Sequence, residues 1–289
     1  MDVVTRIERS LVEALAQADH PGCPPRLAAA MRHAVFPRGA RIRPRLCLAV
    51  AAACGEDEPA VGDAAATAIE LLHCASLVHD DLPCFDDAPT RRGRPSVHRA
   101  FGEPLAVLAG DALIVLAFQS LAAGACRAPA RLGTLVATVS GAVGLPCGIV
   151  AGQAWECEDS IDLAQYQREK TGALFAAATV AGAASAGAEH EQWRRLGASL
   201  GEAFQVADDI LDQAGQAGKI GKPVGQDAAH CRPNAVAELG LSGAYDRLDE
   251  LAAQAVDAVP PCPGRAALRN HILTETMRLL PQDLARHAA

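Results

Sequence analysis

The sequence predicts an all-α protein that forms a single domain over residues 1–289. Half of the residues are hydrophobic but only 3% are aromatic, a balance that suits closely packed helices better than a sandwich or barrel. Apolar residues recur at helical spacing, and no segment of useful length alternates with the period of two that is typical of a strand. The sequence also contains no repeat, low-complexity linker or break in composition that would divide it.

The individual helices are expected between start and stop signals. Thr5 followed by Glu8 predicts a capping box for the first helix. A Gly- and Arg-rich turn at 36–43 precedes a long helix over 60–82, which Pro83 ends because proline disfavours helix at the residue before it. Further helices are expected at 27–35, 46–54, 104–123, 130–145, 162–186 and 189–214, with loops at 83–95 and 215–233 and short helices on either side of 259–264.

Net charge limits the partners of this chain. The formal charge is −8 at pH 7 and the isoelectric point is near 5.6. Proteins that bind nucleic acid carry a basic footprint, so no nucleic-acid partner is expected. A locally basic site for an anion is compatible with this balance.

Ten cysteines are scattered along the chain without a C-x-x-C pair or a zinc-binding spacing. Residues 1–10 are polar and carry Asp2 and Glu8, which is unlike a secretory signal. We therefore expect a reduced, cytoplasmic chain whose cysteines serve as small buried hydrophobic residues.

Two uncharged stretches, 132–155 and 171–188, resemble membrane spans in length. The first is interrupted by Pro146 and several glycines, and the second consists mainly of Ala, Gly, Thr and Ser, whose transfer into lipid is weakly driven. Both are expected as central helices of a soluble bundle, so the chain is not expected to span a membrane.

Two aspartate clusters are the most informative feature of the sequence. The first has the sequence HDDLPCFDD over 79–87 and the second has DDILD over 208–212. Asp208 and Asp212 are one turn apart on the same helix face, where like charges repel. Folding does not require this arrangement, but Mg²⁺ would explain it because it prefers hard oxygen ligands and shares carboxylates with phosphates. A solvated helix end is the alternative for either cluster alone.

Basic residues accompany these clusters in an otherwise acidic protein. Arginine binds phosphate oxygens in bidentate fashion, and lysine acts as a point charge. The pattern therefore suggests a polyanion bridged by metal to the carboxylates, although surface salt bridges would explain any single basic residue. The residues concerned are Arg41, Arg43, Arg91, Arg92, Lys170, Lys219 and Lys222.

Taken in order, the motifs resemble one enzyme family over nearly the whole chain. They comprise Gly39-Ala40-Arg41-Ile42-Arg43-Pro44, Glu70 to His73 before the first cluster, Arg91-Arg92-Gly93, Gly110-Asp111-Ala112-Leu113, Lys170-Thr171-Gly172, Phe204-Gln205 before the second cluster, and Gly221-Lys222-Pro223-Val224-Gly225. This set resembles the short-chain trans-isoprenyl diphosphate synthases. Within that family it is most similar to the bacterial geranylgeranyl diphosphate synthases that feed pigment (carotenoid) synthesis.

The resemblance implies a fold and an activity. The fold would be an isoprenoid-synthase-type helical bundle around a deep central cavity, usually in a homodimer, with the two aspartate motifs facing each other across the mouth. The activity would be a prenyltransferase reaction that condenses isopentenyl diphosphate with allylic diphosphates through a Mg²⁺-assisted carbocation.

The resemblance also implies roles for individual residues. Asp80, Asp86 and Asp208 would ligate two or three Mg²⁺ ions, with Asp81 and Asp212 supporting or sharing that role. The catalytic set would be Asp80, Asp81, Asp86, Lys170, Asp208, Asp209 and Asp212. The allylic diphosphate would be bound by Arg91, Lys170, Thr171, Gln205, Lys222 and Arg232. Isopentenyl diphosphate would be bound by Arg43, His73 and Arg92.

The Gly39 turn departs from the family pattern. The lysine expected there is Ala40. Binding of isopentenyl diphosphate would then depend on Arg43, with Arg38 or Arg41 as candidate helpers.

Later motifs depart from the pattern as well. The aspartate expected three residues after Gln153 is Glu156, a longer carboxylate. In the later loop, Gln226 and Cys231-Arg232 stand where lysines are expected, and only Arg232 keeps the charge. These changes concern affinity more than the type of reaction.

The length of the prenyl product is expected to depend on the residues that precede the first aspartate cluster on its helix. Ser76 lies about 6 Å and Ala75 about 7.5 Å before Asp80 along the helix axis. In the related farnesyl enzymes an aromatic side chain near this level closes the pocket. Both residues are small here, which predicts a C20 product, with C15 as the alternative. Close packing in an Ala-rich bundle would also explain them.

Two other functions remain open at this stage. A class I terpene cyclase would ionise a similar substrate, but it would not need a second diphosphate site, and its second metal motif usually resembles N-S-E. A non-catalytic partner subunit commonly lacks one aspartate motif, whereas this chain keeps both. These features favour the transferase.

Overall fold

The computed structural model describes residues 2–36, 39–160, 163–213 and 234–279. In this part of the chain almost all regular structure is helical, so the predicted all-α class is confirmed. The structure separates into two compact units. The first comprises residues 1–52, 56–139 and 181–188, and the second comprises 53–55, 140–180 and 189–289.

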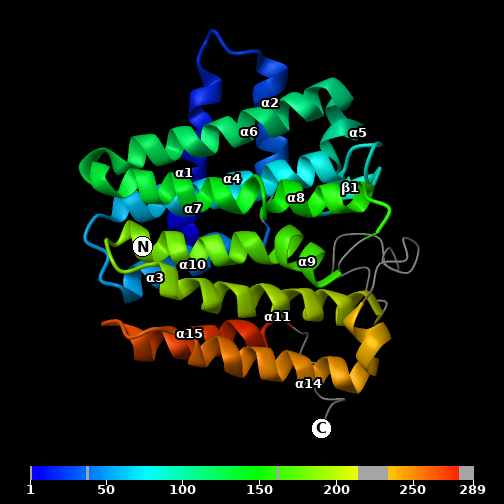
Figure 1. Ribbon diagram of the computed structural model, residues 1–289. Coiled ribbons are helices and arrows are strands. Elements are labelled where there is room, and N and C mark those ends of the chain that lie inside the picture. The colour runs from blue at the N-terminus through cyan, green and yellow to red at the C-terminus, as the bar shows by residue number, and fades with distance from the viewer. Residues whose placement is uncertain (1, 37–38, 161–162, 214–233, 280–289) are drawn as a thin grey trace. The chain divides into compact units, whose positions relative to one another are not determined.

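The first unit contains the N-terminal helices and a short β-hairpin (Figure 1). Its elements, wholly or mainly, are α1 (Val3–Leu15), η1 (Ala16–Asp19), α2 (Pro25–Val35), α3 (Ile42–Ala53), α4 (Pro59–Asp80), β1 (Thr90–Arg91), β2 (Arg94–Pro95), α5 (Val97–Phe101), α6 (Glu103–Gly124), η2 (Ala125–Arg127), η3 (Pro129–Arg131) and α7 (Leu132–Val143). The hairpin strands are antiparallel.

The pairing of α4 with α6 is the main packing interaction of this unit, and small residues make it possible. Gly124 lies so close to α4 that a Cβ there would overlap the methyl group of Ala64 and lie 2.9 Å from the carbonyl oxygen of Ala60. A Cβ at Gly110 would likewise overlap the ring of His79. Close approach of backbones explains why alanine and glycine are frequent in these helices.

The expected boundaries in the first unit need several corrections. The first helix is capped by Asp2, whose carboxylate accepts from the backbone N–H groups of Val4 and Thr5, so the predicted Thr5–Glu8 capping box is wrong. The third helix begins at Ile42 rather than at 46. The hairpin and α5 were not expected, since two-residue strands leave no periodic pattern in the sequence.

The second unit contains the remaining helices (Figure 1). They are α8 (Ile149–Ala154), η4 (Trp155–Cys157), α9 (Leu163–Gln167), the π-helical turn η5 (Arg168–Gly172), α10 (Ala173–Ser185), which continues into the first unit, η6 (Glu191–Trp193), α11 (Arg194–Gln213), α14 (Ala235–Asp257) and α15 (Arg265–Met277). A core of small and branched residues joins α11 to α14, centred on Ile210 and Leu251.

Two expectations about the second unit were wrong. The single helix expected over 162–186 is interrupted by the π-helical turn. The C-terminal helices are not short, since α14 spans 23 residues with a kink at Gly240 and α15 has 13. The expected loop at 215–233, with Lys219, Lys222, Gln226, Cys231 and Arg232, lies outside the described residues.

The cysteines are less buried than expected. Of the nine free cysteines in the described ranges, Cys47 and Cys74 are buried. Four others are exposed, which are Cys84, Cys126, Cys147 and Cys157. The expectation that these residues act as buried hydrophobes is therefore wrong for most of them.

Among the described residues, two helices could cross a membrane by length and composition alone, and they are not the stretches that the sequence suggested. They are Pro59–Asp80 and Glu103–Arg127. Of the most apolar 18-residue stretch of each helix, 78% in the first helix and 39% in the second is buried inside the structure. Core helices of soluble proteins meet the same criteria, so these two helices are only weak evidence of a membrane span.

The close packing of α4 and α6 yields a stability prediction. Gly124→Ala should destabilise the protein by about 1–3 kcal/mol, because the new methyl group overlaps Ala64. Gly133→Ala in α7 is the matched control, since nothing lies within 4 Å of its Cβ position. It should stabilise by up to about 1 kcal/mol through helix propensity. Urea denaturation midpoints measure both effects, and equal shifts would contradict the packing argument.

Candidate functional site

The first aspartate cluster lies where α4 ends. Asp80 is the last residue of the helix, and its carbonyl oxygen accepts a hydrogen bond from the backbone N–H of Asp86 at 3.0 Å. This bond brings the chain back so that both carboxylates, which are half-buried, lie at one end of the helix. The neighbouring Asp81 is only 2% exposed.

Arg91 in the hairpin binds the cluster directly. Its Nε donates to Oδ1 of Asp81 at 2.9 Å, and its Nη2 lies 3.8 Å from Oδ2 of Asp80. Desolvation lowers the pKa of Arg91, but the hydrogen bond and charge of Asp81 outweigh this and raise it. Asp81 therefore holds a cation beside Asp80, and its expected part in Mg²⁺ binding stays a prediction.

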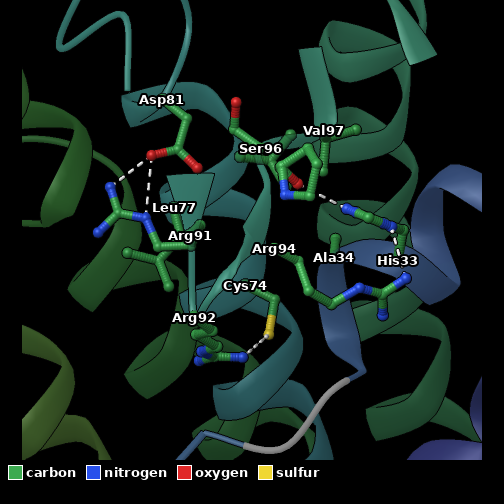
Figure 2. Close-up of a pocket in the computed structure, with 12 residues that line it drawn as sticks. His33, Ala34, Cys74, Leu77, Asp81, Arg91, Arg92, Arg94, Ser96 and Val97 are labelled. Carbon is green, nitrogen blue, oxygen red and sulfur yellow. Dashed lines mark hydrogen bonds and ion pairs between the residues drawn. The ribbon is translucent and has the colours of Figure 1, made fainter. Parts of the chain in front are cut away.

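Two neighbouring faces of α4 carry different groups. Asp80, Ser76 and His73 share one face, because they are spaced by four and three residues. Asp81 and Cys74 lie about one residue further round the helix and are covered by the hairpin, as Figure 2 shows. The helix thus presents two adjacent sets of polar groups.

His73 lies within a cluster of arginines. Desolvation lowers its pKa well below 6.5, and the positive charges of Arg43, Arg92, Arg91 and Arg41 lower it further. The three residues predicted to bind isopentenyl diphosphate, Arg43, His73 and Arg92, are therefore close together in the first unit. At neutral pH the ring of His73 is uncharged among four cations.

Glu70 supplies negative charge to this cluster. Its Oε1 lies 2.5 Å from Nη1 of Arg41 and 3.8 Å from Nη2 of Arg92. Desolvation lowers the pKa of Arg43 to about 10, although the charge of Glu70 opposes this effect. One buried carboxylate is therefore shared among several arginines.

Arg41 is committed to the protein interior. It is 3% exposed, and it also donates to Glu8 and to the carbonyl oxygen of Val35, both at 2.9 Å. Its φ angle of 51° lies in the left-handed region. Arg41 is therefore poorly placed to bind a substrate, and the other candidate helper, Arg38, lies outside the described residues.

A small pocket lies between α2, α4 and the hairpin (Figure 2). Arg94 donates to Nδ1 of His33 at 3.1 Å, and Nε2 of His33 donates to the carbonyl oxygen of Pro95 at 2.7 Å. These bonds anchor the hairpin to α2. A Cβ at Gly39 would lie 2.7 Å from Cζ of Arg92, so glycine there allows the arginine to pack against the turn. The wall of the pocket thus positions Arg92 and Arg94.

The second unit carries a separate set of predicted residues on the π-helical turn. Thr171 donates to Oε1 of Gln205 at 3.1 Å, and Nε2 of Gln205 donates to Oδ1 of Asp209 at 2.9 Å. A Cβ at Gly152 would lie 2.7 Å from Cα of Lys170, so glycine lets α8 pack directly against this turn. The structure therefore links Lys170, Thr171 and Gln205 to the second aspartate cluster.

The three aspartates of the second cluster have different environments. Asp208 is half-buried, whereas Asp212 and Asp209 are buried. Oδ2 of Asp209 accepts from the backbone N–H of Ala235 at 2.8 Å, at the start of α14. Asp209, which was predicted to be catalytic, therefore also anchors the next helix.

The donor atoms fit a divalent cation that is completed by a substrate. Among the described residues no group of three or more His, Cys, Asp or Glu side chains is arranged to hold a metal ion. Mg²⁺ typically takes one or two protein carboxylates together with water and phosphate oxygens. Asp80, Asp86, Asp208 and Asp212 fit that use better than a closed protein cage.

Sequence reasoning missed the roles of two residues. Glu70 was noticed only as part of a motif. Its role as the buried counter-charge of three arginines is visible only in the tertiary structure. Tyr166 had no sequence signal, because its partner Glu156 lies ten residues away across a turn. Glu156 itself was flagged only as a departure from a pattern.

Carboxylate clusters at the ends of two helices, the first of them beside an arginine, suit a diphosphate that is bound through divalent metal ions. The chain belongs to the polyprenyl synthetase family, whose sequence profile matches residues 24–259.

Its similarity to individual members is extensive. It is 53% identical over 280 residues to a geranylgeranyl diphosphate synthase from Cereibacter sphaeroides, covering 97% of each chain. It is also 53% identical over 268 residues to one from Rhodobacter capsulatus, covering 93% of each. A geranyltransferase from Helicobacter pylori, solved with magnesium and isoprenyl diphosphate, superposes with a TM-score of 0.79 at 26% identity, covering 96% of this chain and 98% of the other.

The environment of His73 predicts a pH dependence of stability. The unfolded chain binds a proton at His73 with a pKa of about 6.5, whereas the folded chain binds it only at lower pH. The stability contributed by the neutral ring is therefore fully present above pH 6.5 and is lost as the pH falls toward the folded-state pKa. Urea unfolding at several pH values should show a smaller acid-induced loss in His73→Gln than in the wild type. Parallel profiles would mean that His73 is not desolvated.

Proposed function

We propose that this protein is a trans-prenyltransferase that condenses isopentenyl diphosphate with allylic diphosphates to give all-trans geranylgeranyl diphosphate. The observation that carries the proposal is the arginine cluster around His73 in the first unit. It offers a second polyanion site in addition to the acidic clusters, and an enzyme that joins two diphosphate esters needs two such sites. The 53% identity to two geranylgeranyl diphosphate synthases supports the same product.

The allylic diphosphate would be bound through metal ions and directly by basic and polar side chains. Asp80, Asp86 and Asp208 would ligate Mg²⁺, assisted by Asp81 and Asp212. When bound, the metal ions would neutralise negative charge on the diphosphate and favour its departure. Arg91, Lys170, Thr171 and Gln205 would donate to the phosphate oxygens, together with Lys222 and Arg232.

These residues would favour ionisation of the allylic substrate. The cationic side chains stabilise the charge that develops on the departing diphosphate as the allylic C–O bond breaks. Arg43, Arg92 and the neutral His73 would hold isopentenyl diphosphate so that its alkene attacks the resulting carbocation. The proton lost afterwards is accepted by the departed diphosphate, so no protein base is required. Exclusion of water protects the cation.

The C20 product is proposed from the small residues before Asp80. Ala75 is 1% exposed and Ser76 is half-buried, and neither can block a long tunnel as an aromatic side chain would. A C15 product is the alternative.

We also propose a homodimer that acts in the cytoplasm and supplies carotenoid synthesis. The helix α6 exposes Val107, Leu108 and Val115 along one face. A second copy of the chain is the partner that would cover this face, which also carries the exposed Asp111.

A single incubation separates this proposal from a terpene cyclase and from a non-catalytic partner subunit. Purified protein is incubated with Mg²⁺, isopentenyl diphosphate and one allylic substrate, which is dimethylallyl, geranyl or farnesyl diphosphate. The products are then identified by mass spectrometry. Elongated diphosphates support the transferase. Hydrocarbons from an allylic substrate alone would indicate a cyclase, and the absence of turnover would indicate a partner subunit.

The metal assignment predicts the effect of removing single carboxylates. Asp80→Ala and Asp208→Ala should each lower turnover by about 100-fold or more, because charge on the leaving diphosphate is no longer neutralised. The circular dichroism spectrum should be unchanged. Asp257→Ala is the control, since this aspartate is exposed and pairs with Arg269. Near-normal turnover in either cluster variant would refute the assignment.

The chain-length assignment predicts a change of product rather than of rate. Ala75→Tyr should shift the product from C20 toward C15, because the larger ring would occupy the space that the growing chain needs. Ser76→Phe tests the adjacent position in the same way. Mass analysis of the diphosphates gives the product distribution, and an unchanged distribution in both variants would place the floor of the tunnel elsewhere.

A further inference from the structure

One carboxylate oxygen of Glu156 faces two side chains at once. Its Oε1 lies 2.5 Å from the ammonium nitrogen of Lys170. It also accepts a hydrogen bond from the hydroxyl group of Tyr166 at 2.5 Å. The same ammonium lies 5.6 Å from the centre of the Tyr166 ring, within the range of a cation–π interaction. Lys170 is therefore bounded by a carboxylate and by an aromatic face.

The second oxygen of this carboxylate is also held. Nε2 of Gln153 donates to Oε2 of Glu156 at 3.1 Å, from the last turn of α8. With both oxygens engaged from different elements, the carboxylate has a defined orientation. Lys170 meets an acceptor that is fixed before any ligand binds.

A second carboxylate stabilises the turn that carries Lys170. Glu169 is 4% exposed, and its two oxygens accept from Nε1 of Trp155 and from Nε2 of Gln165, both at 2.9 Å. Trp155 directly precedes Glu156, so the same 3₁₀ turn contacts two successive residues of the π-helical turn. Adjacent bonds of this kind limit how far the backbone of Lys170 can move.

We propose that Glu156 and Tyr166 are positioning residues that hold the Lys170 ammonium ready for the diphosphate of the allylic substrate. This proposal rests on the proposed function. A lysine side chain is long and flexible, and ordering it upon binding costs conformational entropy. A fixed carboxylate reduces that cost in advance. The ammonium has three N–H donors, so it can keep its bond to Glu156 while donating to phosphate oxygens.

The proposal also accounts for the longer carboxylate at this position. An aspartate is expected there from the family resemblance, but the glutamate side chain extends one methylene further. Its oxygen is shared between Lys170 and Tyr166, and the tyrosine hydroxyl limits the added freedom of the longer side chain. Glu156 and Tyr166 thus position Lys170 together.

The test is a double-mutant cycle on kinetic constants. Glu156→Gln keeps the shape of the side chain but removes its charge, and it should lower kcat/KM for geranyl diphosphate about tenfold while KM for isopentenyl diphosphate stays within about twofold. Tyr166→Phe should act in the same direction but less strongly. In a Lys170→Met background, Glu156→Gln should have no further effect, because a positioning residue acts only through its partner.

A control and a binding measurement keep the interpretation specific. Glu191→Gln removes an exposed carboxylate that pairs with Arg194 in the same unit, and it should leave every constant unchanged. Calorimetry with inorganic pyrophosphate and Mg²⁺ should show weaker binding to Glu156→Gln than to the wild type.

The outcomes separate this proposal from the proposed function. The positioning role would be overturned if Glu156→Gln lowered kcat/KM equally in the wild-type and Lys170→Met backgrounds. It would also be overturned if Glu156→Gln and Tyr166→Phe both had wild-type constants. In either case elongation by the wild type would still support the proposed function. If Glu156→Gln fails to fold, Tyr166→Phe and its combination with Lys170→Met give the same comparison. Failure of the wild type to elongate any allylic diphosphate would instead refute the proposed function.

Discussion

Repulsion between like charges is the constraint on which the described sites depend. A protein that binds diphosphates must hold several cations close together before a ligand neutralises them. Each of the principal cations here lies beside a protein carboxylate: Arg91 beside Asp81, Arg92 near Glu70, and Lys170 beside Glu156. The carboxylates reduce the repulsion between the cations in the free protein and also orient the cations.

The partners differ in how deeply they are buried, and this difference indicates different roles. Glu70 is buried between arginines, and removing one member of such a group leaves an uncompensated charge in the interior. Lys170 and Glu156 both remain partly exposed, so the lysine can exchange or share its donors with a ligand. The first arrangement favours a permanent scaffold and the second favours a group that meets substrate.

Backbone geometry contributes to the same end. Arg41 and Arg92 have φ angles of 51° and 53°, in a region that costs an L-residue about 1–2 kcal/mol. Their side chains have several hydrogen-bond and charge partners, which offset that cost. Gly39 and Gly152 contribute differently, since each removes a Cβ where Arg92 or the backbone of Lys170 approaches closely. Backbone strain and small residues thus help to place Arg41, Arg92 and Lys170.

By itself the sequence determined the helical class, the two aspartate clusters and most residues expected to bind diphosphate. Helical periodicity and charged motifs are local properties, and they depend on neighbours within a few positions. The same local reasoning failed at the Asp2 cap, at the hairpin and at the π-helical turn, where tertiary contacts outweigh local preference.

Only the tertiary structure decided which partner each charged residue has. Arg41 and Arg43 are two residues apart and look equivalent in the sequence, yet Arg41 is bound to Glu8 and Glu70 while Arg43 lies beside His73 and Arg92. Tyr166 joins Glu156 in the same way, across a turn. Partnership between distant side chains follows from how helices pack, and helix packing depends on all the contacting surfaces together.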